Sequence, residues 1–330
     1  MASKLIRFLE RMSTKGFTPP VKRLIVRLVA SSNIPRTLLN WYYNLLDASG
    51  RFRFWERYAK IFRKQHRWGL LSPGEWIVNF AGHRIRSPLR SSWSWLDWDT
   101  AVSIVGFDID IKQTYLALIQ SSDRPNLFLD VGANYGTHSV LFLSAGIPAI
   151  AFEPNPSCFS HFQAICKLND LSGRWEEVAI GKESGEIELV YPERNTWLGA
   201  VASDVVSNLK KFDDLKTVRV PIKTLDYYSS EIPRGKALIK IDVEGHEVEV
   251  LKGGTHVLRD CIPKIIFESN DAQKRDDLFQ ILESFGYALW ALPWFPGDSS
   301  NALCLEEFRS AKETNFLAIP NKRPSQATRF

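Results

Sequence analysis

Between about residue 120 and residue 320, short apolar runs alternate with segments in which apolar residues recur every three or four positions. The apolar runs predict buried strands, and the periodic segments between them predict amphipathic helices. Strands are expected at 126–132, 149–153, 175–181, 236–244, 263–269, 287–292 and 315–320, and helices at 137–146, 156–169, 247–258 and 276–286. This alternation predicts an α/β fold, a doubly wound and mainly parallel sheet with helices on both faces.

The pattern changes in two other places. After Gly185, two alternating segments at 186–191 and 218–223 predict a hairpin pair separated by the polar stretch 195–214. Upstream, 75–80 and 83–87 predict a hairpin that turns at Ala81-Gly82, followed by a Trp-rich segment with Trp93, Trp95 and Trp98 and a helix at 111–120. We favour burial of these tryptophans over a ligand-binding role, because dense tryptophans more often pack against a neighbouring layer.

The first 70 residues are predicted to be helical and basic. Apolar residues fall on one helical face in three places, namely Leu5, Phe8, Leu9 and Met12; Val21, Leu24, Ile25 and Leu28; and Phe54, Trp55, Tyr58, Ile61 and Phe62. The chain therefore divides into a basic helical region at 1–70, an entry subdomain at 71–120, the α/β domain at 121–320 and a tail at 321–330. At 330 residues, one full domain with a smaller addition is the expected organisation.

The charge is concentrated at the N-terminal end. The formal net charge is +5, but residues 1–70 hold 15 Lys and Arg against Glu10, Asp47 and Glu56, or +12, which leaves −7 for the remainder. We favour a solvated basic face on these helices. Peripheral contact with an anionic membrane is the second interpretation, and nucleic-acid binding is disfavoured because no recognisable binding module accompanies the charges.

Composition excludes several classes. Hydrophobic residues make up 45% and charged residues 24%, as in ordinary globular proteins. The longest uncharged stretch, Ser139 to Phe152, is too short to cross a bilayer. The start lacks the continuous apolar region of a secretory signal, and the four cysteines lack metal or disulfide spacing, so we predict a cytoplasmic protein whose cysteines are buried.

The first predicted strand runs into the loop LFLDVGANYG, where a doubly wound sheet binds its ligand. Asp130 ends the strand, and Gly132 and Gly136 give the spacing G-x-x-x-G, which lacks the phosphate cradle of G-x-G-x-x-G. Glu153 ends the second strand, 21 residues beyond Gly132, where an acidic group accepts from ribose hydroxyls. These features disfavour a nicotinamide-dependent oxidoreductase and favour a cationic nucleoside cofactor, of which S-adenosylmethionine is the common one.

A third cluster follows the strand at 236–244. The segment IKIDVEGHEVEVLKG places Lys240, Asp242, Glu244, His246 and Glu247 at a strand end and a helix start, on the ligand side of the sheet. Part of this cluster has a structural alternative, because acidic residues in a first helical turn also stabilise the helix dipole.

Taken in order, LFLDVGANYGTHSVLF, AFEPNP, VAIG, TLDYY, IKIDVEGHEVEVLKGG and IIFES resemble the FkbM-type methyltransferases over about residues 125–270. The resemblance implies the Rossmann-like fold of class I methyltransferases, S-adenosylmethionine as cofactor and a hydroxyl acceptor on a saccharide, a lipid-linked sugar or a small metabolite. It also implies cofactor-binding residues, which are Asp130, Gly132, Ala133, Asn134 and Gly136 in the first loop, Glu153 at the ribose, Ala179 near the adenine and Asp242 at the methyl-facing end.

Transfer to a hydroxyl needs a group that accepts or relays one proton. Candidate catalytic residues are Asp242, Glu244 and His246, with Glu268 at the end of the fifth strand as a further possibility. We expect no metal, because no recognised metal-ligand spacing is present. The competing function is a non-catalytic protein, associated with a membrane or nucleic acid, that keeps this fold as a scaffold.

Overall fold

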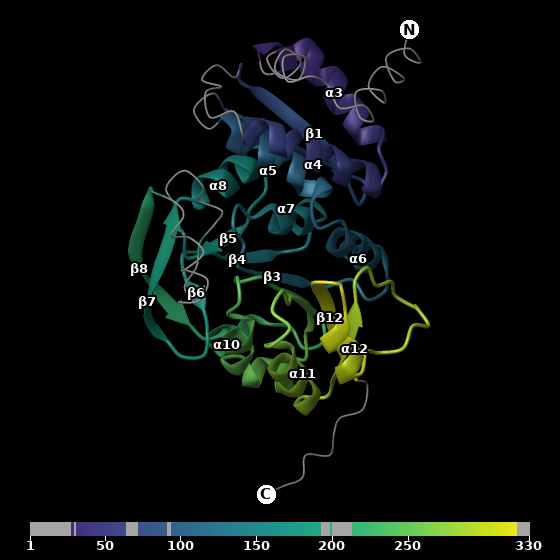
Figure 1. The fold of residues 1–330 in the computed structure, drawn as a ribbon, viewed down its shortest axis with the longest axis vertical. Helices are drawn as coiled ribbons and strands as arrows, with labels where there is room; N and C mark the ends of the chain where they lie inside the picture. The colour runs from purple at the N-terminus through teal and green to yellow at the C-terminus, as the bar shows by residue number, and fades with distance from the viewer. Residues whose placement is uncertain are drawn as a thin grey trace, which may run out of the picture. The chain divides into compact units, whose positions relative to one another are not determined.

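The computed structural model of the protein describes residues 28–29, 31–63, 72–90, 94–192, 199 and 213–321. The chain divides into two compact units, one comprising Met1–Ile109 with Lys167–Asp170 and the other Asp110–Cys166 with Leu171–Phe330. Figure 1 traces both units. The amphipathic helices predicted before residue 28 and most of the C-terminal tail lie outside the described residues.

In the described part of the first unit, three helices accompany a β-hairpin. The helices are α3 (Asn33–Leu45), α4 (Ala48–Arg63) and α5 (Ser94–Gly106), and the hairpin pairs β1 (Gly74–Phe80) with β2 (His83–Leu89). Ala81 and Gly82 connect the strands with φ values of 49° and 82°, as a tight two-residue hairpin turn requires. The hairpin predicted at Ala81-Gly82 is therefore confirmed.

Aromatic side chains fill the core of this unit. Trp76 and Trp98 are buried with their ring centroids 5.1 Å apart, and Tyr43 lies 5.4 Å from Trp76. The burial of Trp98 agrees with the structural interpretation of the Trp-rich segment. The side chains of Trp93 and Trp95 lie outside the described part of the molecule.

Helix α3 buries polar as well as apolar side chains and exposes a row of apolar ones. On its buried side, the Asn40 side chain both donates to the Ile77 carbonyl at 2.7 Å and accepts from the Ile77 amide at 2.9 Å, and Arg36 donates to the Ser72 carbonyl at 2.8 Å. On its exposed side lies a row at positions i, i+4, i+7 and i+11, which we call the α3 apolar stripe: Ile34, Leu38, Trp41 and Leu45.

The second unit is built on a seven-stranded sheet with the order β11-β12-β10-β9-β3-β4-β5. Its strands are β3 (Leu127–Val131), β4 (Ala149–Phe152), β5 (Arg174–Glu176), β9 (Ala237–Ile241), β10 (Lys264–Glu268), β11 (Tyr287–Ala291) and β12 (Asn315–Pro320). Only β12 runs antiparallel to its neighbours. Because the chain leaves β3 toward β4 while β9 lies on its other side, the switch point of the sheet falls at the end of β3.

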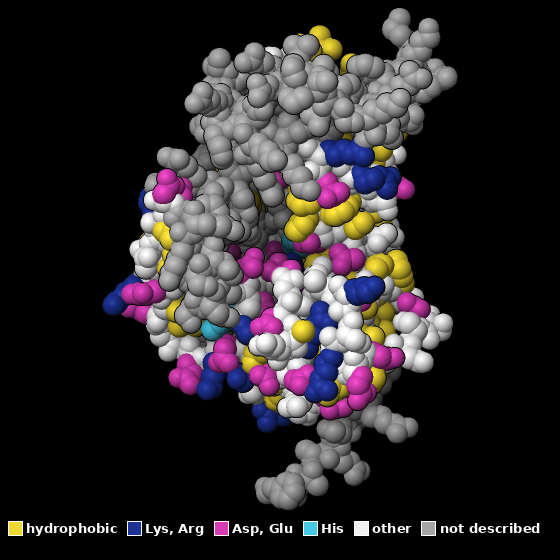
Figure 2. Space-filling view, in the orientation of Figure 1, with side chains coloured by type: hydrophobic (Ala, Val, Ile, Leu, Met, Phe, Trp, Pro, Cys, Tyr) yellow, Lys and Arg dark blue, Asp and Glu magenta, His cyan; other side chains and the backbone are white. Residues whose placement is uncertain are grey.

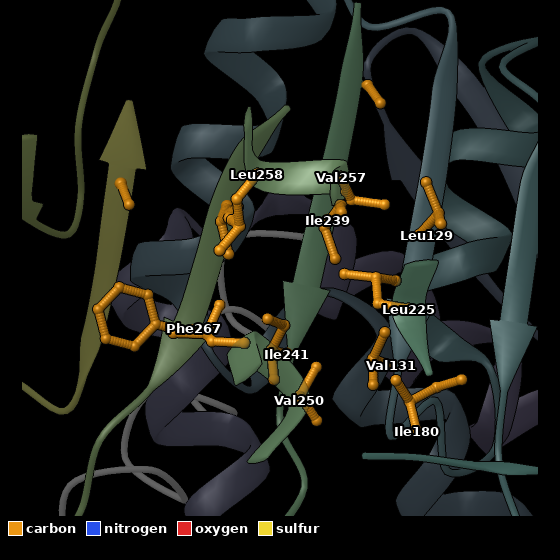
Figure 3. Close-up of a cluster of buried hydrophobic side chains, with 14 of the residues drawn as sticks. Leu129, Val131, Ile180, Leu225, Ile239, Ile241, Val250, Val257, Leu258 and Phe267 are labelled. Carbon is orange, nitrogen blue, oxygen red and sulfur yellow. The ribbon is translucent and has the colours of Figure 1, made fainter. Parts of the chain in front are cut away.

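Helices cover both faces of this sheet, as predicted (Figure 1). On one face, Phe128 of β3 stacks on Phe142 with ring centroids 3.9 Å apart. On the other, Leu129 and Val131 join the core cluster drawn in Figure 3 with Val250 and further side chains. The helices are α6 (Ile109–Gln120), α7 (Thr137–Ser144), α8 (Phe159–Leu168), α10 (Glu247–Lys252) and α11 (Arg275–Ser284). The doubly wound, mainly parallel α/β fold is thus confirmed.

Beside this sheet, β7 (Gly185–Pro192) pairs antiparallel with β8 (Leu215–Lys223), which confirms the hairpin pair predicted after Gly185. The single strand predicted at 175–181 is wrong. It divides into β5, in the main sheet, and β6 (Ala179–Ile180), which pairs with β8 in the small one. The break falls where the Val178 amide donates to the Glu176 carbonyl at 2.9 Å.

The helix predicted at 247–258 is also shorter than expected. Helix α10 ends at Lys252, and a separate π-helical turn covers Val257–Cys261. Gly253 follows α10, and a Cβ there would lie 2.0 Å from the Gly181 carbonyl oxygen. Helix α10 therefore ends where the backbone of Gly253 lies close to the backbone of Gly181, just after β6. A further helix, α12 (Leu305–Ser310), was not predicted.

Cys158, Cys166 and Cys261 are buried, as expected, whereas Cys304 is exposed, and none of the four forms a disulfide bond. Among the described residues, no helix combines the length and the apolar character that crossing a membrane requires.

Candidate functional site at the carboxyl edge of the sheet

Four adjacent parallel strands carry a carboxylate at or just past their carboxyl ends. Phe152, Val131, Ile241 and Phe267 are aligned across β4, β3, β9 and β10. At this level lie the members of what we call the carboxylate row: Glu153, Asp130, Asp242 and Glu268. Figure 2 shows acidic side chains close together near the centre of the view. The strand register thus brings together four acidic residues that are far apart in the sequence.

Asp130 anchors the loop after β3. It is completely buried, and its Oδ2 accepts from the amide of Ser139 at 3.0 Å and from its hydroxyl at 2.7 Å. The other oxygen, Oδ1, is buried with no hydrogen-bond partner. A buried carboxylate oxygen with unused acceptor capacity is suited to a donor or a cation arriving from outside the protein.

The loop holds its shape through its backbone. The amides of Gly132 and Ala133 both donate to the Phe152 carbonyl at 3.0 Å. Gly132 has φ 78°, and a Cβ there would lie 1.8 Å from the Asp242 carbonyl oxygen. At Gly136, with φ 68°, a Cβ would meet the Phe162 ring. Both positions therefore need glycine for conformation and for space.

Glu153 is fixed by the neighbouring loops. Its Oε2 accepts from the Asn134 amide and its Oε1 from the Asn155 amide, both at 2.8 Å. Burial raises the pKa of Glu153 to about 7 despite these two bonds, and Asp130 and Asp242 add to the rise. Each oxygen retains a second lone pair for a hydroxyl donor.

The loop after β9 carries Asp242 and Glu244. The Lys240 ammonium lies 2.9 Å from Asp242 Oδ2, and the lysine side chain is almost fully buried. Glu247 stabilises the conformation of this loop, because its Oε1 accepts hydrogen bonds from the amides of Val243 and Gly245. Desolvation, followed by the Asp242 and Glu247 carboxylates, raises the pKa of Glu244.

Glu268 lies beside Asp242. Asp242 and Glu268 directly follow Ile241 and Phe267, which are paired in register on the adjacent strands β9 and β10. Burial and the charges of Asp242 and Glu244 raise the pKa of Glu268. Asp242 therefore has a buried cation on one side and a second carboxyl group on the other.

Two other predicted residues lie apart from this row. Ala179 is buried in β6, paired with Ile222 of β8. His246 precedes α10, and its ring lies beside Gly181. Of the three proposed catalytic residues, the structure brings Asp242 and Glu244 together. The described contact of His246 is with Gly181, near the start of α10 and away from the carboxylate row.

Sequence reasoning missed a polar layer beneath the row. His138 Nδ1 lies 3.2 Å from the Tyr115 hydroxyl, and burial, with the charges of Lys240 and Lys112, holds the pKa of His138 well below its usual range. The sequence offered only a weak indication of His138 and Ser139. Both lie in the first turn of α7, directly after the glycine-containing loop that follows β3. Among the described residues, no group of three or more His, Cys, Asp or Glu side chains is arranged to hold a metal ion.

Comparison with known proteins places this edge in context. Residues 130–289 match the family model described as the methyltransferase FkbM domain. "Methyltransferase 1" of Beauveria bassiana is 29% identical over 192 residues, which are 51% of this chain and 77% of that protein.

Two further similarities cover less of the other chain. The "Hexuronic acid methyltransferase AglP" of Haloferax volcanii is 30% identical over 149 residues, 43% of this chain and 55% of that protein. A crystal structure of a methyltransferase FkbM from Methylobacillus flagellatus KT aligns at 13% identity with a TM-score of 0.40, covering 84% of this chain and 62% of that one. The chain thus spans less than two thirds of both.

Proposed function

We propose that the chain, whose residues 130–289 form a methyltransferase domain of the FkbM family, transfers a methyl group from S-adenosylmethionine to a hydroxyl oxygen of a saccharide or a related metabolite. The observation that carries this proposal is the carboxylate row. When bound, S-adenosylmethionine supplies an activated methyl group on a sulfonium cation. The protein's contribution is to bind it, to orient the acceptor and to take one proton.

The residues present fit this cofactor. S-adenosylmethionine carries two cationic groups and a ribose. The carboxylate row offers four carboxyl groups, and among the described residues its cationic partner is Lys240, which is paired with Asp242. Asp130 Oδ1 is buried with no partner, and Glu153 keeps lone pairs for the ribose hydroxyls. A pyrophosphate would instead meet carboxylates without a phosphate cradle, which opposes a dinucleotide.

Roles for the individual residues follow from this geometry. Asp130, Gly132, Ala133, Asn134 and Gly136 would line the methionine and ribose end, with Glu153 on the ribose hydroxyls. Ala179, buried beside the end of β5, would lie toward the adenine. Asp242 would mark the end that faces the transferred methyl group, and Asp242, Glu244 and His246 stay the candidates for proton transfer, joined by Glu268.

A sugar hydroxyl is the acceptor that the site favours. One of the relatives is named for a hexuronic acid, which offers both hydroxyl and carboxylate oxygens. Methylation of a carboxylate releases no proton, whereas methylation of a hydroxyl releases one. A carboxylate in the cluster around Asp242 could accept this proton. The cluster therefore supports a hydroxyl, and not a carboxylate, as the methyl acceptor.

The test is methyl transfer from labelled S-adenosylmethionine to a uronic-acid glycoside and to its neutral counterpart. We expect an alkali-stable methyl ether, formed by the full chain and reduced about 100-fold or more in Asp242→Asn. Asp277→Asn, at an exposed position of α11, is the matched control. An alkali-labile methyl ester as product would show that the acceptor is a carboxylate and not a hydroxyl. Cofactor binding without methyl transfer to any acceptor would favour the non-catalytic scaffold.

A second proposal concerns the basic N-terminal region. The α3 apolar stripe exposes Ile34 at 75%, Leu38 at 43%, Trp41 at 44% and Leu45 at 58%, within a region of net charge +12. Exposed apolar residues on one helix face, in a chain segment whose sequence is rich in Lys and Arg, favour shallow binding to an anionic lipid surface. We therefore propose that α3 contacts membranes peripherally.

Sedimentation with lipid vesicles tests this contact. Vesicles containing phosphatidylglycerol should bind the full chain, and salt should weaken the binding. Replacing Leu38 and Trp41 by Ser should lower the partition coefficient by about 10-fold or more. Phe295→Ser, which removes an exposed aromatic residue elsewhere, should leave binding unchanged. Equal binding by neutral and anionic vesicles, or by both variants, would refute the proposal.

A further inference from the structure

The chain leaves β11 at the same edge of the sheet as the carboxylate row. β12 runs antiparallel to β10, and its first residue, Asn315, is the partner in register of Glu268. The amide of Leu292, the residue after β11, donates to the Asn315 carbonyl at 3.2 Å. The segment 292–302, which we call the β11 loop, therefore begins two strands from Glu268, about 10 Å across the sheet.

Helix α6 holds Asp110 and the β11 loop on one face. Asp110 and Thr114 are four residues apart on this helix, so their Cβ atoms are about 5–6 Å from each other. The Asn315 side-chain amide donates to Asp110 Oδ2 at 3.1 Å. The Trp294 amide donates to Thr114 Oγ1 at 2.8 Å, and Figure 1 shows the loop beside α6. Asp110 is thus linked through Asn315 to the end of the carboxylate row and lies one helical turn from the β11 loop.

The β11 loop carries an exposed aromatic ring on a fixed backbone. Trp294 is 9% exposed, with its ring centroid 6.5 Å from that of Trp290, whereas Phe295, the next residue, is 46% exposed. The Phe295 carbonyl accepts from the Asp298 amide at 3.0 Å, which closes a turn. Because hydrogen bonds hold the backbone on both sides of it, the Phe295 ring offers a flat apolar surface at a defined place. Such a surface suits the apolar C–H face of a ring-shaped ligand.

Asp110 can accept hydrogen bonds from a ligand, and as a carboxylate it donates none. It has room for about four hydrogen bonds, of which the Asn315 amide supplies one. Asn315 is 8% exposed and Asp110 is partly exposed, so the amide orients a carboxylate that solvent reaches. A matching ligand therefore brings donors, as sugar hydroxyls do. A carboxylate group on the ligand brings none, and Asp110 would repel its charge.

We propose that Asp110 and Phe295 form the acceptor subsite and that this subsite binds a neutral sugar ring, whose hydroxyls donate to Asp110 while its C–H face packs on Phe295. The proposal rests on the proposed function, because it extends the same site beyond Glu268. Asn315 is a positioning residue, since it acts through Asp110. The sugar then reaches from the β11 loop toward Asp242, at the end that faces the transferred methyl group. In this arrangement Asp110 selects against uronic acids.

Methyl transfer from labelled S-adenosylmethionine to methyl glucoside and to methyl glucuronide tests the subsite. We expect the unmodified full chain to prefer the neutral glucoside by about 10-fold in kcat/KM. Asp110→Asn should raise KM for the glucoside by about 10-fold with little change in kcat. The same variant should reduce the preference for the glucoside over the glucuronide, which a merely structural role of Asp110 would not do.

The aromatic ring is tested separately, at a position where substitution leaves the core intact. Phe295→Leu should raise KM for the glucoside by about 5-fold, whereas Phe295→Tyr, which keeps the ring, should not. Asp277→Asn, at an exposed position of α11, is the control and should behave as the unmodified chain. Titration of each variant with S-adenosylmethionine should give the affinity of the unmodified chain, which shows that the cofactor loops are intact.

Two results would overturn the inference and leave the proposed function in place. One is methyl transfer with equal or better use of the glucuronide by the unmodified chain, which needs no variant and so does not depend on the folding of Asp110→Asn. The other is an unchanged KM for the glucoside in both Asp110→Asn and Phe295→Leu. Transfer to neither sugar would instead overturn the proposed function, and the inference would fall with it.

Discussion

Gly132 joins the two loops of the candidate site. Its positive φ and the 1.8 Å separation between an added Cβ and the Asp242 carbonyl oxygen leave no room for a side chain. The loop after β3 can therefore lie against the loop after β9 only if this position is glycine. This contact brings the ends of the two strands at the switch point together.

Gly132→Ala should lower the unfolding free energy by more than about 3 kcal/mol, because it adds a clash with backbone to the strain at positive φ. Gly146→Ala is the matched control. Gly146 has φ 74° but no atom within 4 Å of an added Cβ, so only the backbone strain, about 1 kcal/mol, applies. Denaturant unfolding of both variants gives the comparison, and equal losses would contradict the close approach.

Glu153 makes stability depend on pH. Its pKa is raised from 4.5 to about 7 in the folded chain, so the folded state binds more protons than the unfolded state between these values. Stability contributed by this group is therefore present below pH 4.5 and is lost as the pH rises through about 7.

Relative to Glu153→Gln, the unmodified chain should lose about 2–3 kcal/mol of unfolding free energy between pH 4.5 and pH 7. Denaturant unfolding without cofactor at the two pH values measures this difference. A difference that stays constant, or that grows with pH, would show that Glu153 is not held in a desolvated position.

For individual residues, the sequence predicted the site where the residues belong to one local motif. Asp130, Gly132 and Glu153 are all at the strand ends where the pattern predicted them. The hydrogen bonds from Ser139 to Asp130 and the position of Glu268 beside Asp242 were not predicted. Both depend on which helix face or which strand lies next to which, and spacing along the chain does not contain that information.

Among the elements, α11 is tied to the end of the sheet by one buried arginine. The Arg275 guanidinium donates to the carbonyls of Phe308, Ala311, Ser269 and Glu313 at 2.7–3.1 Å. These carbonyls belong to the end of β10, to α12 and to the segment leading into β12. A planar group with several fixed donors suits such a set, and an ammonium does not.

Arg275→Lys should therefore destabilise the chain by about 3 kcal/mol, through lost hydrogen bonds and carbonyls left unpaired. Arg309→Lys, in an exposed pair with Asp276, should leave the unfolding free energy nearly unchanged, because solvent screens an exposed ion pair. Thermal unfolding of both variants is the measurement. A similar small loss in both would mean that Arg275 does not hold these elements together.

Element prediction failed where tertiary packing ends an element. The segment 175–181 has one apolar pattern, yet its halves pair with different sheets. The helix predicted at 247–258 ends at Gly253, which meets the Gly181 backbone. In both cases the local pattern is continuous, and the boundary is set by a neighbour distant in sequence.

For the whole molecule, alternation of strands and helices was enough to predict a doubly wound sheet. The antiparallel β12 and its insertion between β10 and β11 were not predicted, because apolar runs do not encode strand direction. The register of the parallel strands β4, β3, β9 and β10 creates the carboxylate row. The division of the chain into four parts and the roles of the site residues stay predictions.

The central claim is that the carboxylate row binds a cationic nucleoside cofactor. Titration calorimetry of the purified full chain with S-adenosylmethionine and, separately, with NADH tests it most directly. We predict saturable binding of S-adenosylmethionine alone, weakened by about 1–3 kcal/mol in Glu153→Ala through lost hydrogen bonds. Binding of NADH, or of neither compound to a demonstrably folded chain, would contradict the account.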